Sequence, residues 1–538
     1  MKQTFFILLM LLLLCSLPPS GWCEEPTIPG QVSKDHWSCR ELSELGRRYQ
    51  AEGVLPDRPT VARRDLAAGF LVILEKVSKK CTSEGGEPLS AEDRTRLATL
   101  HGALKEELAG IDAYKSVRAS IEQLLSPPEE PPYLLKVGVS GFLRGEGSGN
   151  FTYSLAGSGY APGSGVGRLT YRILPYLEWN PTDYLELEVQ GEGYGFTLGS
   201  PRDSQYSLYQ AYLEISPPES KRIKLKLGRQ EFVYGSAFIL GGNSFYNGLT
   251  YDAARLRMKP VGELSLDLLG GYYAAPQNHY FRDSLAGAYL TYPLGEGTGV
   301  EAYYIRDQGA QFTVSGERLE SLGARGTLRL GALSLELEPV YQTGRLAVSG
   351  TTGRIDAWGG HVDATLDAEV GGVKNSFVCG YAHGSGSQDA ADGRTTRREF
   401  SNPTNNTGLI GDMGLFHDLS GVTTNDGIHH ASGLRIVTAG WGINLRKDLN
   451  FTATGRYYRA GNAPSGMSRE LGVESDFILT WNLNDDTALL LAYDRFFTGA
   501  FFRDATGSGS DIDYGYVMLQ FNLSTGIKKP AQIAKITP

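Results

Sequence analysis

The stretch that decides the fold is LTYRILPYLEWNPTDYLELEVQGE, residues 169–192. Its two arms flank the turn sequence Asn-Pro-Thr-Asp at 180–183, and apolar and polar residues alternate along each arm. Successive side chains of a β-strand point to opposite faces, so the stretch predicts a hairpin with one apolar and one polar face. In the second arm the two faces consist of Leu185, Leu187 and Val189, and of Glu186, Glu188, Gln190 and Glu192.

The length and repetition of such arms favour a membrane barrel over a soluble sandwich, which would bury the apolar face against a second sheet. Short turns alternate with long glycine-rich stretches near 145–165, 232–248, 344–356 and 385–430, as periplasmic turns alternate with outer loops. We predict an all-β transmembrane barrel of about 18 antiparallel strands over residues 133–523. Its apolar face meets lipid and its charged face encloses water.

The composition agrees with this class of protein. Among 538 residues, 21% are charged and 41% hydrophobic, because only half of each barrel strand is apolar. The net charge of -9 and the absence of a basic patch with interleaved aromatics exclude nucleic acid as a partner. The apolar run at 5–17 is too short to span a bilayer, so residues 1–23 are predicted to be a secretory signal peptide rather than a retained anchor.

Short motifs distinguish residues 33–80. Asp35-His36-Trp37 opens the segment, a glycine-containing turn follows at 53–57, and Arg63-Arg64-Asp65 comes next. The segment resembles a surface-layer-homology module, with Asp65 in place of the family's glutamate, a shortened central turn and a single copy. The resemblance implies a periplasmic module that binds peptidoglycan or another cell-wall polymer through Trp37, Arg63 and Asp65. A purely structural helical spacer is the alternative.

Residues 89–126 show helical spacing in Leu97, Leu100, Leu104 and Leu108. The spacing fits a coiled coil that joins protomers, and in porins with such a module a coiled coil implies a homotrimer. It fits equally well an amphipathic helix that packs on a neighbouring helix of the same chain. The sequence Pro-Pro-Glu-Glu-Pro-Pro at 127–132 predicts a stiff linker, and 524–538 a C-terminal tail. Cys39 and Cys81 could pair in an oxidising compartment, whereas Cys379 stands alone in a strand.

A second set of motifs lies in the barrel region: Gly228-Arg229-Gln230, Tyr234-Gly235, the strand at 251–256 and the stretch at 471–476. In this order they resemble the alginate-export family of outer-membrane barrels over about residues 135–523, with Ala253 where the family usually has glycine. The resemblance implies an arginine-rich lumen that guides an acidic polysaccharide.

The alternation of faces places several charges on the polar side of the strands. Arginine suits such a lumen because its planar fork binds carboxylates at two points. The predicted pore-lining residues are Arg168, Arg172, Glu178, Glu186, Glu188, Glu214, Arg255, Arg257, Asp363, Asp367, Arg456, Glu474 and Asp476. The direction of Arg229 stays open. We expect the two signs to segregate across the pore, and the excess of acid argues against alginate itself as the solute.

Signs of catalysis or of bound cofactors are weak. His417-Asp418 and His429-His430 lie in a long predicted loop without a serine nucleophile motif, and no Cys-x-x-Cys-His haem site occurs. We therefore predict a non-enzymatic outer-membrane channel without cofactor or metal. It would pass small or anionic, including saccharide, solutes passively, while its periplasmic module binds the cell wall. The alternatives are a structural tether between outer membrane and peptidoglycan, and a sheath for a separate electron-carrier protein.

Overall fold

A computed structural model describes residues 30–528, with gaps at 52–53, 83–88, 112–113, 116–120, 122–132, 155–156, 199–202, 219, 221, 243–247, 275–283, 309–317, 349–350, 388–395, 403–406 and 425–426. The predicted signal peptide and the proline-rich linker lie outside the described residues, as do residues 529–538 of the predicted tail. The chain divides between Pro131 and Pro132 into two compact units. Each unit is described by itself below.

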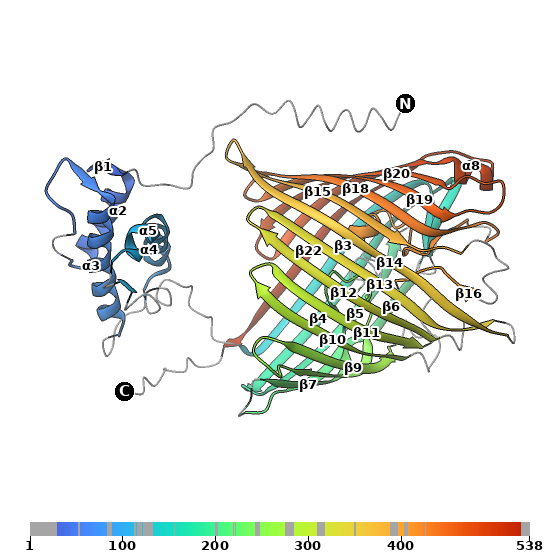
Figure 1. Ribbon diagram of the computed structural model, residues 1–538, viewed down its shortest axis with the longest axis horizontal. Coiled ribbons are helices and arrows are strands. Elements are labelled where there is room, and N and C mark those ends of the chain that lie inside the picture. The colour runs from blue at the N-terminus through green and yellow to red at the C-terminus, as the bar shows by residue number, and fades with distance from the viewer. Residues whose placement is uncertain are drawn as a thin grey trace. The chain divides into compact units, whose positions relative to one another are not determined.

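The N-terminal unit is a small helical module. Its elements are β1 (Gln31–Ser33), α2 (Trp37–Arg48), β2 (Thr60–Ala62), α3 (Arg63–Thr82), α4 (Ala91–Ala103) and α5 (Lys105–Ala109) (Figure 1). β1 and β2 pair antiparallel. Ser90 caps α4 by accepting a hydrogen bond from the Asp93 amide, which satisfies one free donor of the first turn. None of the described helices is both long and apolar enough to cross a bilayer.

The predicted leucine stripe of residues 89–126 packs within the same chain. Leu97, Leu100, Leu104 and Leu108 are fully buried in one cluster with residues of α2 and α3. Across this interface Arg96 pairs with Glu41 at 2.6 Å. The packing uses the apolar face that a coiled coil between protomers would need, so the stripe gives no support to the expected trimer. Cys39 is buried with a free thiol, and the side chain of Cys81 lies outside the described residues.

The second unit is a closed antiparallel barrel of eighteen strands, in which β3 and β22 pair with each other (Figure 1). In chain order the strands are β3 (Tyr133–Ser154), β4 (Gly157–Thr182), β5 (Leu185–Leu198), β6 (Asp203–Ile215), β7 (Ile223–Gln230), β8 (Tyr251–Met258), β9 (Ser265–Tyr273), β10 (Ser284–Gly295), β11 (Thr298–Gln308), β12 (Arg318–Leu330), β13 (Leu333–Val348), β14 (Thr351–Val370), β15 (Val373–Gly384), β18 (His430–Arg446), β19 (Leu449–Asn462), β20 (Glu470–Asn484), β21 (Thr487–Thr498) and β22 (Ile512–Lys528). The predicted fold class is thus confirmed.

Further short elements lie in the connections between strands. β16 (Thr396–Arg397), α7 (Thr407–Ile410) and β17 (Gly421–Thr423) lie between β15 and β18, which pair directly with each other. α8 (Ala500–Thr506) lies between β21 and β22.

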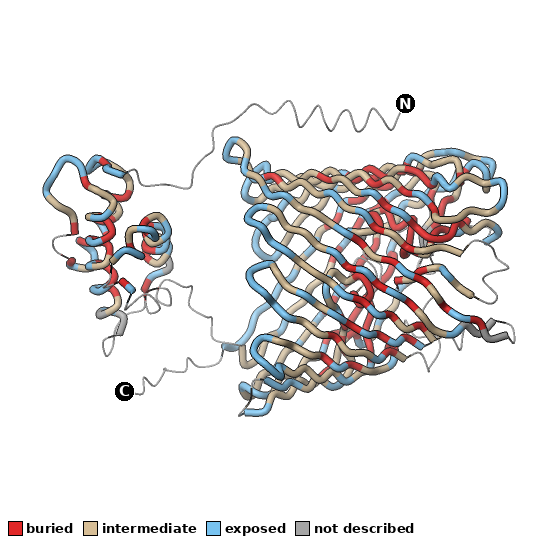
Figure 2. The backbone as a smooth tube through the Cα atoms, viewed as in Figure 1, coloured by how far each residue is buried: buried red, intermediate tan, exposed pale blue. Residues whose placement is uncertain are grey.

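The two faces of the wall differ as the alternation predicts. On β4, Leu177 and Trp179 are 41% and 44% exposed on the outer face, whereas inward-facing Thr170 and Arg172 are buried. Figure 2 shows that the buried parts of this unit gather inside the barrel, toward the end that carries α8. An apolar outer face around a polar interior is the arrangement of a barrel solvated by lipid.

Short turns join the strands at one end of the barrel, at positions such as 183–184, 331–332 and 447–448. The chain also enters β3 and leaves β22 at that end, because Tyr133 pairs with Lys528. Two of the expected long loops are strands instead: 145–165 and 344–356 belong to the hairpins β3–β4 and β13–β14. Their glycines suggested loops, but the alternation continues through them. β22 likewise runs beyond the expected barrel end at Leu523.

Candidate functional site: the barrel lumen

Two connections fold into the barrel and narrow its interior. The first inserted segment is residues 231–242, after β7, and the second consists of residues 398–402 and 407–424, before β18. Phe238 of the first stacks on Phe400 of the second at 5.7 Å, and both rings are fully buried. Phe416 of the second segment stacks on Tyr458 of β19 at 4.5 Å. The inserted segments therefore meet inside the wall and form a constriction.

Polar side chains of β19 and β20 hold the second inserted segment. Arg456 donates to the Gly408 carbonyl at 3.0 Å and forms a buried ion pair with Asp476. Tyr458 donates to the Ile410 carbonyl at 3.1 Å and to Glu474 at 3.0 Å. The structure thus brings together Arg456, Glu474 and Asp476, and this group binds the second inserted segment to the wall.

Gly411 marks the closest approach of the second inserted segment to the wall. Its φ of 113° favours glycine, and a Cβ there would lie 2.6 Å from both the Tyr458 hydroxyl and Glu474 Oε1. Beside it, Tyr516 donates to Asp412 at 3.0 Å. Burial, followed by the nearby charge of Asp476, raises the pKa of Asp412 to about 6.

A second group of charges lies on β3, β4 and β5. Arg168 and Arg144 both pair with Glu146, at 2.7 and 2.9 Å, and Arg172 pairs with Glu192 at 2.8 Å. The sequence predicted Arg168 and Arg172 as pore-lining and placed Glu192 on the polar face, but it did not identify Glu146. The residues Arg144 and Glu146 border the glycine-rich stretch that was expected to be a loop. The unbroken alternation of Phe142, Arg144 and Glu146 with their neighbours was the signal that could have identified them.

The third group joins β5 to β8. Glu214 binds Lys224 at 2.8 Å, with Lys226 and Arg255 both at 3.6 Å. Next to it, Tyr212 donates to Glu186 at 3.2 Å and to Glu188. Four predicted residues, Glu186, Glu188, Glu214 and Arg255, therefore share one cluster.

The remaining predicted residues are dispersed. Arg257 pairs with Asp267 at 2.8 Å, and Glu178 accepts from Asn180 at 2.7 Å beside a turn. Asp363 contacts His361 at 2.5 Å. Asp367 lines a cavity of about 500 Å³ near the short turns.

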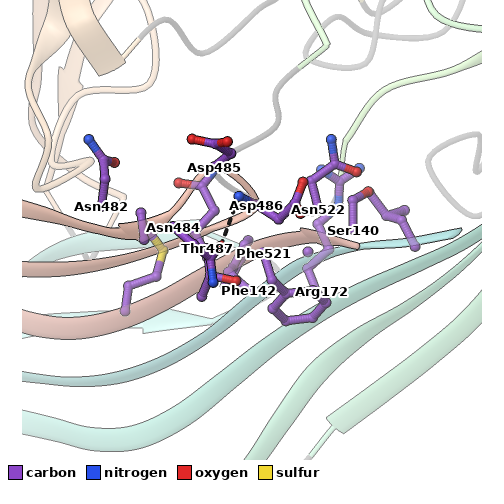
Figure 3. Close-up of a pocket in the computed structure, with 15 residues that line it drawn as sticks. Ser140, Phe142, Arg172, Asn482, Asn484, Asp485, Asp486, Thr487, Phe521 and Asn522 are labelled. Atoms are coloured by element: carbon purple, nitrogen blue, oxygen red, sulfur yellow. Dashed lines mark hydrogen bonds between the residues drawn. The ribbon is translucent and has the colours of Figure 1, made fainter. Parts of the chain in front are cut away.

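A larger cavity of about 580 Å³ opens inside the wall near the short-turn end (Figure 3). Arg172 lies at one side of it, and Asp485 and Asp486 from the β20–β21 turn lie at another. Ser140 and Asn522 supply neutral polar groups to the same cavity. This vestibule can hold water and small polar molecules.

Arg229 points away from the lumen. It pairs with Asp252 through two bonds of 2.7 and 2.9 Å on the outer face, which it shares with exposed Leu227. The alternation of β7 continues without a bulge through Arg229, so the side chain that the sequence left undecided lies on the outer face.

The expected segregation of charge is wrong, because opposite charges are interleaved around the wall. Each predicted lumen arginine pairs with a carboxylate on the neighbouring strand or, for Arg255, on the next strand but one. Among the described residues Glu178, Glu186, Glu188 and Asp367 form no ion pair. Glu146 is shared by two arginines and Glu214 by three cations, so paired and unpaired charges of both signs alternate along the interior.

In the N-terminal unit, the residues predicted to bind cell wall are partly used within the chain. Arg63 donates to Glu107 at 2.9 Å and to the Ala103 carbonyl at 3.1 Å. Hydrogen bonding from Arg63 lowers the pKa of Glu107 below its ordinary value. The guanidinium fork that an anionic polymer would need is thus occupied, while Trp37 and Asp65 stay half-buried.

A sequence profile of the alginate-export family matches residues 196–514. The chain belongs to the alginate-export family. The predicted resemblance of the barrel is thereby confirmed, and the chain is an outer-membrane β-barrel of this family. The profile does not extend to residues 33–80, for which the surface-layer-homology resemblance stays a prediction.

Solved porins share the fold of this alginate-export barrel. A BenF-like porin from Pseudomonas fluorescens Pf-5 is 10% identical, with a TM-score of 0.50 over 73% of this chain and 99% of that chain. OccK11 (OpdR) from Pseudomonas aeruginosa is 16% identical, with a TM-score of 0.49 over 74% and 98%. Identities this low show the fold alone. No curated protein matches the chain in sequence.

Proposed function

We propose that this protein is a passive outer-membrane channel for small polar solutes. The observation that carries the proposal is a closed lipid-facing barrel whose narrowed interior carries charged groups beside its buried apolar cluster. Solutes enter the vestibule near the short turns and move down their gradient past the constriction. The predicted lumen charges then act as pore-lining groups.

The balance of charge supports a preference for cations over anions. Glu178, Glu186 and Glu188 gather at the short-turn end without an ion pair among the described residues, and Asp485 and Asp486 border the vestibule. Rings of unpaired carboxylates attract cations in a channel mouth. The anionic solutes expected from the arginines fit less well, because each of those arginines already has a carboxylate partner.

Planar-bilayer recording under a salt gradient tests the proposal. The full chain should give discrete conductance steps and a reversal potential on the cation-selective side. Combined Glu186→Gln and Glu188→Gln should move that potential toward anions, whereas Glu320→Gln on the outer face removes the same type of charge and should leave it unchanged. Complete absence of conductance would instead favour a structural tether, in which the inserted segments close the lumen.

The N-terminal unit is proposed to attach the channel to the cell wall in the periplasm. The support is the surface-layer-homology motif together with the barrel topology, since the chain enters β3 at the short-turn end. Because Arg63 is held by Glu107, we propose that Trp37 contributes more of the contact. Sedimentation with purified peptidoglycan should be weakened by Trp37→Ala and less by Arg63→Ala. If the parent protein, Trp37→Ala and Arg63→Ala all sediment equally with peptidoglycan, the N-terminal unit is a structural spacer and not a wall-binding module.

A further inference from the structure

A compact set of metal-ligating side chains lies on the inner wall at the constriction. Glu336 and Glu338 project from β13, and His361 and Asp363 project from β14 directly opposite them. The His361 side chain is 4% exposed and that of Glu338 is 3% exposed. One donor atom each from Glu336, Glu338 and His361 lies within 4.8 Å of the others, the only such group among the described residues.

The hydrogen bond on the far side of the imidazole defines its orientation. His361 Nδ1 lies 2.5 Å from the Asp363 carboxylate. A carboxylate at this position holds the Nδ1 proton and leaves the Nε2 lone pair for a ligand, as behind the histidines of many zinc sites. His361 Nε2 faces Glu338 at 3.5 Å and Glu336 at 3.8 Å. A lone pair and two carboxylates that face one another can bind a cation between them.

These separations fit a small divalent ion. Donor atoms about 2.0–2.1 Å from a tetrahedral zinc lie about 3.3 Å from each other. His361 Nε2 is within about half an ångström of that separation from each carboxylate, and the donor oxygens of Glu336 and Glu338 lie within 4.8 Å of each other. One nitrogen and two oxygens form the three-ligand set of an open zinc site, with the fourth position toward the lumen. Ser236 Oγ, 2.8 Å from Glu338 and 3.2 Å from His361, lies beside this position.

Arg325 is the internal competitor for this position. It binds Glu336 at 2.8 Å and Glu301 at 2.8 Å, and its Nε lies 3.9 Å from Glu338. One guanidinium faces three carboxylates here. When an ion takes Glu336, Arg325 keeps Glu301 as its partner.

We propose that Glu336, Glu338 and His361 form a binding site for a divalent transition-metal ion, with Asp363 as the outer partner of the histidine. The site lies where the inserted segments meet the wall. Phe238 of the first inserted segment packs against His361 at 5.0 Å, and it also stacks on Phe400 of the second. An ion bound here would stiffen the constriction and add positive charge to the path.

Binding is measured on the detergent-solubilised full chain with Zn²⁺ alone, by calorimetry and by metal content after dialysis. We expect one ion per chain. His361→Gln and Glu338→Gln should each weaken binding at least about tenfold. His430→Gln is the matched control, because that histidine faces the single carboxylate Glu399 at 2.8 Å, and it should bind as the parent does.

X-ray absorption at the zinc edge of the unmodified protein serves as a readout that needs no variant. One imidazole nitrogen among otherwise oxygen ligands is expected. A parent chain that binds no stoichiometric zinc, a zinc bound only by oxygen or by sulfur, or undiminished binding in both variants would overturn the proposal. Binding does not depend on transport, so a failed conductance experiment leaves this test intact.

Discussion

Removing Arg456 is the perturbation whose consequences the structure defines most sharply. The side chains of Arg456 and Asp476 are 7% and 3% exposed, and Arg456 also donates to the Gly408 carbonyl of the second inserted segment. Arg456→Met leaves Asp476 buried without its counter-charge, which costs about 3–5 kcal/mol when one partner of a buried pair is lost. The neighbouring carboxylate of Glu474 adds to the uncompensated charge.

Urea unfolding of the vesicle-embedded barrel, followed by tryptophan fluorescence, measures this loss. Arg495→Met is the control, because the Arg495 side chain is 39% exposed in its pair with Asp511 and should cost less than about 1 kcal/mol. Arg456→Met combined with Asp476→Leu should recover most of the stability, since both charges are then gone. A single-variant loss no larger than that of Arg495→Met would refute the reasoning.

Three further predictions concern the inserted segment and the N-terminal unit. Gly411→Ala, whose Cβ would meet Tyr458 and Glu474, should displace the second inserted segment and change single-channel conductance. Gly466→Ala is the control, because it also replaces a glycine of positive φ but has nothing within 4 Å of its Cβ, and it should leave the conductance unchanged. Asp412 binds its proton more tightly in the folded chain than in the unfolded chain. Its contribution to the free energy of unfolding should therefore be full below the unfolded pKa of 3.8 and decrease as the pH rises toward about 6. Asp412→Asn should remove this pH dependence from the free energy of unfolding. Arg63→Ala should speed hydrogen exchange in α5 by loosening its contact with α3, and unchanged exchange there would contradict the assigned role of the Arg63–Glu107 pair.

The strands were predictable because their signal is local. Alternation with a period of two needs no knowledge of distant partners, and it identified the strand count and the inward direction of residues such as Arg172 and Glu188. It failed where glycine outweighed it, at 145–165 and 344–356, and in the first of these stretches Glu146 was missed as the partner of two arginines.

The constriction was beyond local patterns. Phe238 and Phe400 are far apart in sequence and meet only after both connections fold inward, and neither segment has a regular period. Ion pairs posed the same difficulty: Arg63 was expected to face a polymer, yet its partner Glu107 lies 44 residues further along the chain. Contacts between elements depend on tertiary packing, which a single sequence does not encode in any short motif.

Thiol accessibility at two adjacent positions tests the central claim most directly. Leu177→Cys and Glu178→Cys, each in a chain with Cys379→Ser, are reconstituted into lipid vesicles and treated with a charged, membrane-impermeant maleimide. The account predicts rapid labelling at 178, which faces the aqueous interior, and very slow labelling at 177, which faces acyl chains. Equal labelling of both positions, or labelling confined to 177, would contradict it.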